Sequence, residues 1–277
     1  MSQLILKLTG LPRTMLLTLR GRAEEQARSV PLFQDELAVE WRKFLPWDDQ
    51  LERFYSQFAQ IAWAVRAYQF DVVANKHIAS VQNPLVVELG AGLSTRYHRV
   101  RQEQLHWIEL DLPEVTNLRR QLDIETEQHQ FMSSSVMDFA WMDALPSKPP
   151  ESILFIAEGL LVYFEANQVQ QLVNQMRQRF PSATLLMDVV GELSKPIANQ
   201  MAQQGWPLQW YVKGEREVAE MGLSLVNVWS LYQLCPERWP FLLRSQSWIP
   251  DIRNGCLILE TKLEPFGQYI EPRSLNG

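Results

Sequence analysis

The stretch from Val86 to Arg96, VVELGAGLSTR, decides the fold class of this 277-residue chain. Its apolar run carries one acid, Glu88, and leads into two glycines two positions apart, Gly90 and Gly92. Glycine allows a tight turn from a strand into a helix and lets the backbone approach a ligand closely. In an open parallel sheet, the ligand crevice lies beyond the carboxyl ends of the strands. The stretch therefore predicts a first strand whose glycine turn supports a nucleoside-bearing ligand.

After Pro84, short apolar runs alternate with longer amphipathic ones. The candidate strands are LVVEL at residue 85, LHWIEL at 105, HQFMS at 129, ILFIAEG at 153, TLLMDVV at 184, LSLVNVW at 223 and CLILETKL at 256. The clearest helical pattern between them is NQVQQLVNQMRQRF, from residue 167. Short apolar strands that alternate with helices indicate a parallel sheet covered on both faces. We therefore expect an α/β fold with a seven-stranded, mostly parallel sheet whose last strand turns back beside its neighbour.

The chain before the sheet, residues 1–83, is predicted to form a helical N-terminal cap. Apolar side chains recur at helical spacing in DDQLERFYSQFAQIAWAVRAY, and Asp48 or Asp49 is the expected N-cap. A second helical piece is expected to end at Asn83-Pro84, since proline disfavours a helix at the preceding residue. Residues 84–264 are then the sheet core, with an insert at about 191–222 between the fifth and sixth strands. We expect residues 1–277 to form a single domain.

Composition argues against several classes of protein. The 26 basic and 32 acidic residues give a net charge of −6, which argues against nucleic acid or an anionic membrane as the main partner. The basic residues Arg96, Arg99 and Arg101 are expected to form a solvated helix face. The apolar patches of residues 1–22 are interrupted by Lys7 and Arg13, so we expect neither a signal peptide nor a membrane span.

Cysteine and histidine residues are few and scattered. Cys235 and Cys256 provide neither a disulfide framework nor a CxxC pair, which fits a reducing, cytoplasmic setting. The four histidines and two cysteines show no metal-ligand spacing, and we expect no metal. Composition gives no indication of the oligomeric state.

The second predicted strand supplies the next indication of a ligand. It ends in Asp111, nineteen residues after the second glycine of the turn. A carboxylate there can accept hydrogen bonds from both ribose hydroxyls of an adenosine; alternatively, Glu109 and Asp111 are exposed charges at a strand end. Thr95 stands where a dinucleotide fingerprint has its third glycine beside the pyrophosphate. S-adenosylmethionine is an adenosine ligand without a pyrophosphate, and its cationic sulfonium would suit Glu88 and Glu158.

Three motifs in order and spacing carry a family resemblance: VVELGAGLSTRYHRV, WIELDLPEV and IAEGLLVYF. The chain resembles the leucine carboxyl methyltransferase superfamily, and more closely its bacterial branch of tetracenomycin-type polyketide O-methyltransferases. The upstream segment GRAEEQARSVPLFQDELA is similar to the N-terminal signature of that branch. The resemblance runs from about Arg20 to Val190. It implies a class I methyltransferase fold with S-adenosylmethionine as the methyl donor.

The resemblance also implies roles for individual residues by their position. Arg66 in VRAYQF matches a basic residue that holds the carboxylate of the donor. Gly90 matches the donor-binding turn, and Asp111 matches the ribose acid. Glu158 in AEGLLVY falls near the methionine end of the donor, whereas Tyr163 in the same motif is expected to belong to the core.

The adenine side departs from the family pattern. Ser135 and Val136 fall where the family usually has Asp-Leu beside the adenine. Asp138, three residues further on, is the alternative acid for that role. Ser94 stands in the glycine turn where the family often has aspartate. The contacts to the adenine therefore stay open between Ser135 and Asp138.

The implied function is O-methylation of a small molecule, most simply a carboxylic acid, by in-line displacement. A carboxylate is already ionised at neutral pH and requires no general base, and no catalytic residue is identified. Lys195 in the insert either pairs with a substrate carboxylate or is an ordinary exposed lysine. Hydroxyl methylation and a protein C-terminus as acceptor stay open. Two other functions also stay open: a nicotinamide-dependent oxidoreductase, and a non-catalytic module that binds S-adenosylmethionine.

Overall fold

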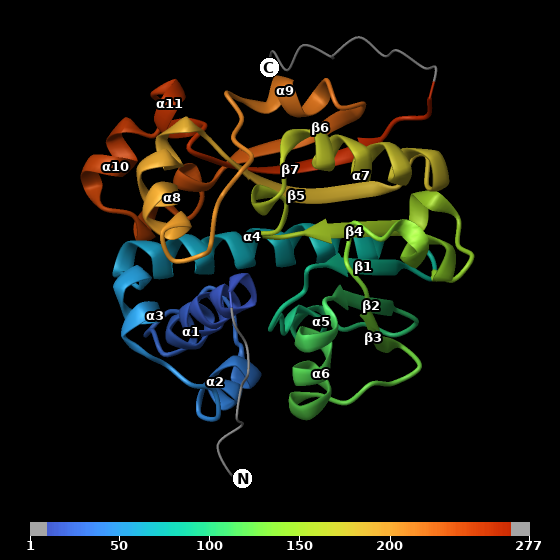
Figure 1. Cartoon of the computed structure of the whole chain (residues 1–277), viewed down its shortest axis with the longest axis horizontal. Coiled ribbons are helices and arrows are strands. Elements are labelled where there is room, and N and C mark those ends of the chain that lie inside the picture. Colours follow the sequence, from blue (N-terminus) through green and yellow to red (C-terminus); the bar gives the residue numbers. More distant parts are fainter. Residues whose placement is uncertain (1–9, 267–277) are drawn as a thin grey trace.

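The computed structural model describes residues 10–266 and contains a seven-stranded sheet in the order β3-β2-β1-β4-β5-β7-β6 (Figure 1). Strands β1 to β5 run parallel, whereas β7 runs antiparallel to both β5 and β6. The expected mostly parallel sheet is confirmed, and the last strand turns back and inserts between β5 and β6. The strands are β1 (Leu85–Leu89), β2 (His106–Asp111), β3 (His129–Ser133), β4 (Ile153–Ala157), β5 (Thr184–Val190), β6 (Leu223–Ser230) and β7 (Cys256–Leu263).

The apolar runs form strands because both faces of the sheet are covered. Every residue of β1 and of β4 is buried, which is typical of central strands in a parallel sheet. The strand order reverses between β1 and β4, so the loops that follow these two strands diverge. Such a reversal leaves a crevice at the carboxyl ends of the strands. The glycine turn follows β1 at this crevice.

Some helices cover the two faces of the sheet, and others lie beyond the carboxyl ends of its parallel strands. They are α1 (Met15–Gln26), α2 (Glu36–Arg42), α3 (Asp49–Phe54), α4 (Gln57–Ser80), α5 (Arg96–Val100), α6 (Pro113–Leu122), α7 (Ala166–Arg179), α8 (Lys195–Ala202), α9 (Glu215–Ala219), α10 (Phe241–Gln246) and α11 (Pro250–Arg253). Short 3-10 turns are η1 (Leu11–Thr14), η2 (Phe139–Ala144), η3 (Pro150–Ser152), η4 (Leu161–Tyr163), η5 (Glu192–Ser194), η6 (Leu231–Gln233) and η7 (Pro236–Arg238).

Two hydrophobic clusters hold helices against the two faces of the sheet. On one face, Val65 and Phe70 of α4 pack against Val86 of β1 and Ile156 of β4. On the other face, α7 and α9 pack against the remaining strand side chains. Helix α4 therefore covers the sheet along its length, although the sequence placed all of residues 1–83 in a cap.

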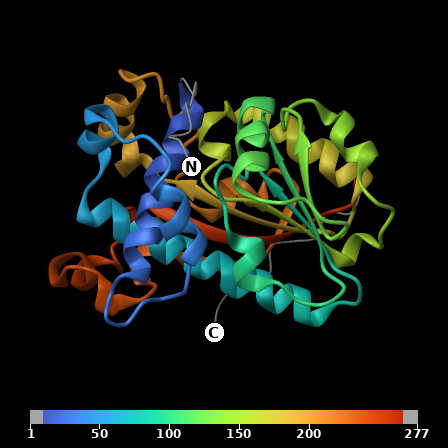
Figure 2. The same ribbon diagram turned by 90° about the horizontal axis from the view of Figure 1, so that it is seen from below.

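Helices α1, α2 and α3 lie beyond the carboxyl ends of the parallel strands, which both views show (Figures 1 and 2). Leu19 of α1 and Trp41 of α2 pack in one cluster with Val115 of α6 and Trp206 of the insert. The indole Nε1 of Trp206 also donates to the carbonyl of Gly10 at 2.9 Å. The first part of the chain and the insert thus meet over the crevice and enclose it.

One helix boundary differs from the prediction. The helix expected to run on from Asp48 or Asp49 breaks at Tyr55, and α4 starts anew after Ser56. Asp48 caps α3 by accepting from the N–H of Leu51, and Ser56 caps α4 by accepting from the N–H of Ala59. A serine that offers its side chain to the backbone in this way favours a helix start. Helix α4 then ends at Ser80, before the Asn83-Pro84 step that was expected to end it.

Within residues 10–266, no helix is both long enough and apolar enough to cross a bilayer. The segment 1–22, where neither a signal peptide nor a membrane span was expected, lies partly outside the described residues. Its described part forms η1 and most of α1, and α1 packs its leucine side chains against α2 and α6.

Candidate active site

A cavity of about 780 Å³ opens at the carboxyl ends of the central strands. Its volume lies within the range of sites for ligands of nucleoside size and larger. The cavity is bounded by the glycine turn after β1, the ends of β2 and β4, the segment after β3, and helices α1 and α4. All of the donor-site residues proposed from the sequence line this cavity: Arg66, Glu88, Gly90, Gly92, Asp111, Ser135, Val136 and Glu158.

The glycine turn needs glycine at its first position. Gly90 has φ 61°, and a Cβ atom there would lie 2.5 Å from Cδ1 of Leu160. The N–H of Gly90 donates to the carbonyl of Leu110 at 2.8 Å, which ties the turn to the end of β2. The backbone of the turn therefore faces the cavity without a side chain between them. Such a bare turn is a suitable support for a nucleoside.

Asp111 links the second strand to the glycine turn. Its Oδ2 accepts from the N–H of Gly92 and its Oδ1 from the N–H of Leu112, both at 2.7 Å. Burial raises the pKa of Asp111 to about 6, even though these two hydrogen bonds act in the opposite direction. The alternative of exposed strand-end charges is wrong for Glu109, which is buried against Arg119.

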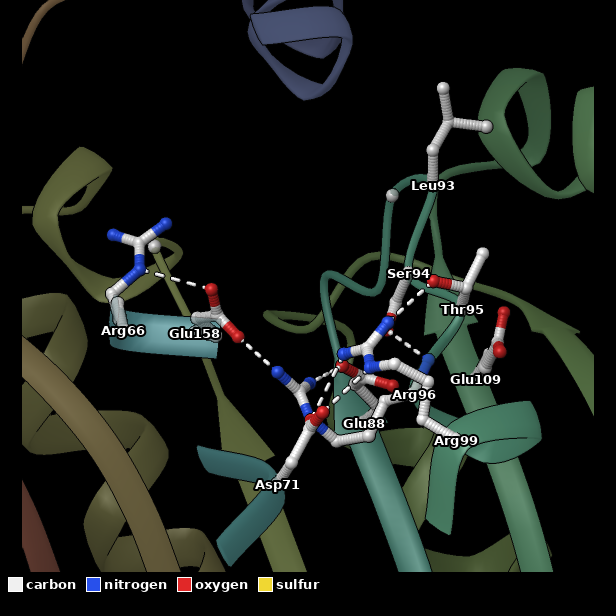
Figure 3. A network of polar contacts seen from close by, with 12 residues as sticks. Arg66, Asp71, Glu88, Leu93, Ser94, Thr95, Arg96, Arg99, Glu109 and Glu158 are labelled. Carbon is white, nitrogen blue, oxygen red and sulfur yellow. Dashed lines mark hydrogen bonds and ion pairs between the residues drawn. The ribbon is translucent and has the colours of Figure 1, made fainter. Parts of the chain in front are cut away.

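Arg66 projects from α4 toward the end of β4 (Figure 3). Its Nε donates to Oε1 of Glu158 at 3.0 Å, and its Nη1 donates to Oδ2 of Asp188 at 2.9 Å. The side chain is 14% exposed, and it lines the cavity. The guanidinium is thus held by two acids and still borders the space where a ligand would lie.

A second arginine, Arg96, lies at the centre of the same ionic network (Figure 3). It donates to Asp71 at 2.8 Å and also pairs with Glu88 and Glu158. Arg99 pairs with Asp71 as well, and its side chain is only 7% exposed. The expectation that these arginines form a solvated helix face is wrong for Arg96 and Arg99. Helix α5 is short and packs against α4, so these two side chains meet Asp71 of that helix.

The network contains one more carboxyl group than guanidinium groups. Its members are Arg22, Arg66, Arg96 and Arg99 with Asp35, Asp71, Glu88, Glu158 and Asp188. Burial raises the pKa of Glu88 to about 7 against the attraction of Arg96. Burial alone would raise the pKa of Glu158 too, but Arg96 and Arg66 outweigh it and lower that pKa to about 2. The ionised Glu158 favours a cationic ligand in the cavity.

The two residues proposed to lie beside the adenine, Ser135 and Asp138, occupy different places in the structure. Ser135 and Val136 line the cavity, next to Ser134. Asp138 is exposed, and its carboxylate accepts from the N–H of Ala140 at the start of η2. Of the two candidates, the structure brings Ser135 to the cavity and leaves Asp138 away from it.

The other half of the cavity is mostly apolar. It is built by the N-terminal helices, the end of β4 and the insert: Leu11, Pro12, Phe54, Phe58, Trp63, Val162, Tyr163, Phe164, Ile197, Met201 and Leu208. Tyr163, expected in the core, lies on this wall, and burial raises the pKa of its hydroxyl. Lys195 pairs with Glu192, is half-exposed and lies outside the lining. The insert thus contributes apolar side chains to the cavity.

Sequence reasoning missed several polar residues of the site. Asp188 is 1% exposed inside β5, and Asp71 lies on the buried side of α4. Arg22 of α1 donates to Asp35 at 3.1 Å. A charged residue inside an apolar run was the available signal, because a buried acid requires a partner. Asp188 carries this signal, since it is the only charged residue of the run TLLMDVV.

A separate polar cluster lies outside the lining of the cavity. The possible ligand atoms of His98, Asp123 and His129 lie within 4.8 Å of one another. His98 pairs with Asp123 at 2.7 Å, and His129 pairs with Glu109 at 2.9 Å. The guanidinium of Arg119 contacts both acids.

Comparisons with known proteins agree with this geometry. The sequence model of the family described as Leucine carboxyl methyltransferase matches residues 15–177, which is more than half of the chain. The tetracenomycin polyketide synthesis O-methyltransferase TcmP of Streptomyces glaucescens is 27% identical over 232 residues, which cover 82% of this chain and 85% of that protein. An S-adenosyl-L-methionine-dependent methyltransferase of Gibberella zeae, dpfgK, is 24% identical over 235 residues, covering 76% of this chain and 78% of its own length.

A solved structure supports the fold. The crystal structure of a DUF574 family protein from Streptomyces avermitilis matches with a TM-score of 0.56 and 14% identity. The match covers 89% of this chain and 97% of that protein. At this identity the likeness concerns the fold alone.

Proposed function

Since the chain belongs to the leucine carboxyl methyltransferase family and is an S-adenosylmethionine-dependent O-methyltransferase, we propose that it methylates a carboxylate on an apolar small molecule. The family membership argues against the nicotinamide-dependent oxidoreductase and the non-catalytic module. The observation that carries the proposal is the division of the cavity into a polar half and an apolar half.

The polar half fits S-adenosylmethionine. Arg66 would hold the donor's carboxylate, and Asp111 would accept hydrogen bonds from the ribose hydroxyls. Gly90 and Gly92 would support the nucleoside, and Glu88 and Glu158 would attract its cationic centre. Ser135 and Val136 would border the adenine. Bound S-adenosylmethionine supplies an activated methyl group on a positively charged sulfur.

The apolar half fits the body of the acceptor. TcmP, which is 27% identical, is named for O-methylation in tetracenomycin polyketide synthesis, and this supports an apolar acceptor here. Among the described residues that line the cavity there is neither lysine nor histidine. A carboxylate nucleophile needs neither of them as a general base, since it is ionised near pH 7, whereas a phenol of pKa about 10 must lose a proton first. The chain then contributes alignment and exclusion of water.

The test is methyl transfer from S-adenosylmethionine carrying a labelled methyl group. The probes are an aromatic carboxylic acid, its carboxamide and the phenol of the same ring system. We expect a labelled methyl ester from the acid alone, and mild base should release the label from this ester. Label on the phenol and none on the acid would instead assign a hydroxyl acceptor. A chain that binds S-adenosylhomocysteine but methylates none of these probes would contradict the proposed acceptor class.

Donor affinity is expected to rise as the pH rises through about 6. The pKa of Asp111 is raised to about 6, and the ribose hydroxyls bind the ionised carboxylate better than the protonated one. Below that pKa, affinity should fall by up to about tenfold per pH unit, because binding must then expel a proton. Calorimetry with S-adenosylhomocysteine from pH 5 to 7, in two buffers of different ionisation heat, measures both the affinity and the released proton.

The Asp111→Asn variant is the control for this pH dependence. Glu88 also titrates near the site, with a pKa raised to about 7, so the variant separates the two carboxyl groups. We expect the variant to bind more weakly at pH 7 and to lose the rise through pH 6. An unchanged pH profile in the variant would remove Asp111 from the ribose site.

A further inference from the structure

Asp188 divides its two carboxylate oxygens between two partners at the edge of the cavity. Its Oδ1 accepts from the backbone N–H of Gly159 at 2.5 Å, and its Oδ2 accepts from Nη1 of Arg66 at 2.9 Å. The residue is 1% exposed and lies on β5, beside the end of β4. The two hydrogen bonds tie the loop after β4 and the arginine of α4 to one rigid strand.

Gly159 provides the room in which the guanidinium lies. Its φ is 61°, and a Cβ atom there would lie 2.9 Å from Nη2 of Arg66 and 3.3 Å from Nη1. A non-glycine residue at this position would be strained in its backbone and would push against the arginine. The guanidinium therefore packs directly on the bare Cα of Gly159.

These contacts leave one edge of the guanidinium available. Nε donates to Glu158 and Nη1 to Asp188, while Nη2 makes no hydrogen bond to any of residues 10–266. A guanidinium is planar and carries five donors in a fixed arrangement. Fixing Nε and Nη1 therefore also fixes the direction in which the Nη2 donors point. Arg66 lines the cavity, so this edge is the one that a ligand can reach.

We propose that Asp188 is a positioning residue which, together with Gly159, orients Arg66 for the carboxylate of the methyl donor. The inference rests on the proposed role of Arg66 in holding that carboxylate. Electrostatics alone predicts the opposite effect, because the negative charge of Asp188 opposes a second carboxylate nearby. Removing the charge would then tighten donor binding, whereas loss of the orientation would weaken it. The sign of the change in affinity thus decides between the two accounts.

The experiment compares two ligands in the full chain by calorimetry. S-adenosylhomocysteine carries the amino acid tail, and 5′-methylthioadenosine has the same nucleoside and sulfur without that tail. In Asp188→Asn and in Gly159→Ala, we expect the affinity for S-adenosylhomocysteine to fall at least tenfold. The affinity for 5′-methylthioadenosine should stay within twofold of the wild-type value. In an Arg66→Ala background, adding Asp188→Asn should change neither affinity further.

Glu109→Gln is the matched control. Glu109 is also a buried acid paired with an arginine, Arg119, but it lies outside the cavity lining. Its replacement is expected to lower stability while leaving the ratio of the two ligand affinities unchanged. Gly159→Ala keeps the test decisive if Asp188→Asn fails to fold.

Three outcomes would overturn the inference. Tighter or unchanged binding of S-adenosylhomocysteine in Asp188→Asn would show that Asp188 acts by charge alone or not at all. An equal loss for both ligands would show a general structural role. A persisting effect of Asp188→Asn in the Arg66→Ala background would show that it does not act through Arg66. Failure of the proposed role of Arg66 is distinguishable, because Arg66→Ala alone would then bind S-adenosylhomocysteine as tightly as the unaltered chain.

Discussion

Replacing Arg66 by alanine is expected to lower the affinity for S-adenosylhomocysteine by at least a hundredfold. Hydrogen bonds to a charged group contribute about 1.5–3 kcal/mol each, and a guanidinium can make two to a carboxylate. A loss of about 3 kcal/mol already corresponds to more than a hundredfold in affinity. The variant also leaves Glu158 and Asp188 without their shared cation, and these acids would then repel the carboxylate of the ligand. Isothermal calorimetry measures the loss.

Two controls accompany this prediction. Arg66→Lys keeps the charge but cannot reproduce a planar, two-pronged contact, so its affinity should lie between those of the wild type and Arg66→Ala. Binding of 5′-methylthioadenosine, which has no carboxylate, should be nearly retained in both variants. Equal affinities for S-adenosylhomocysteine in all three proteins would mean that Arg66 belongs only to the ionic network.

Replacing Arg96 by methionine is expected to cause the largest loss of stability. Arg96 is 2% exposed and pairs with Asp71, Glu88 and Glu158. Removing one partner of a buried ion pair costs about 3–5 kcal/mol, because the remaining charge stays buried without compensation. For a chain of this size, the melting temperature should fall by roughly 10 °C. Thermal unfolding at pH 7.5 measures the effect.

The loss of stability in Arg96→Met is expected to depend on pH. In the wild type the pKa of Glu158 is lowered to about 2, so its stabilising contribution is present above its unfolded pKa and is lost only as the pH falls through about 2. In Arg96→Met, Glu88 loses the guanidinium that opposes the effect of its burial, and its pKa, already raised to about 7, should rise further. The destabilisation should therefore be largest at neutral pH and smaller at pH 5.

Arg120→Met is the matched control for Arg96→Met. Arg120 pairs with Glu125, and both side chains are 38% exposed. Exposed ion pairs contribute about 0–1 kcal/mol, so this variant should unfold within a few degrees of the wild type. Similar losses in the two variants would contradict a special role for the buried network.

The sheet could be predicted closely because its central strands are buried on both faces. The stretches predicted as strands from residues 85, 129, 184 and 256 coincide with the strands β1, β3, β5 and β7. The break between α3 and α4 could not be read from periodicity, because the apolar spacing continues through it. Only the capping hydroxyl of Ser56 marks the new start.

The residues proposed to bind the donor could be brought to one cavity from the sequence, since their motifs lie at the carboxyl ends of neighbouring strands. The ionic network could not be predicted, because its partners are far apart in the chain. Arg66 and Asp188 are separated by 122 positions, and Arg66 and Glu158 by 92. The expectation that Arg96 and Arg99 face solvent was wrong for the same reason, since the local sequence carries no information about acids that other elements bring to them.

The apolar half of the cavity is the product of long-range packing. Phe54 and Trp63 come from the N-terminal helices, whereas Ile197 and Met201 come from the insert on α8. Aromatic and aliphatic residues of this kind are as common in cores as in pockets. Their place on the cavity wall follows from the packing of the insert against the first helices over the crevice.

The most direct measurement is a crystal structure of the chain with S-adenosylhomocysteine. The account predicts the carboxylate of the ligand at the free Nη2 edge of Arg66 and its ribose hydroxyls on the carboxylate of Asp111. It also predicts that Arg66 keeps its contacts with Glu158 and Asp188. A ligand whose carboxylate lies away from Arg66, or whose ribose bonds elsewhere than Asp111, would contradict the account.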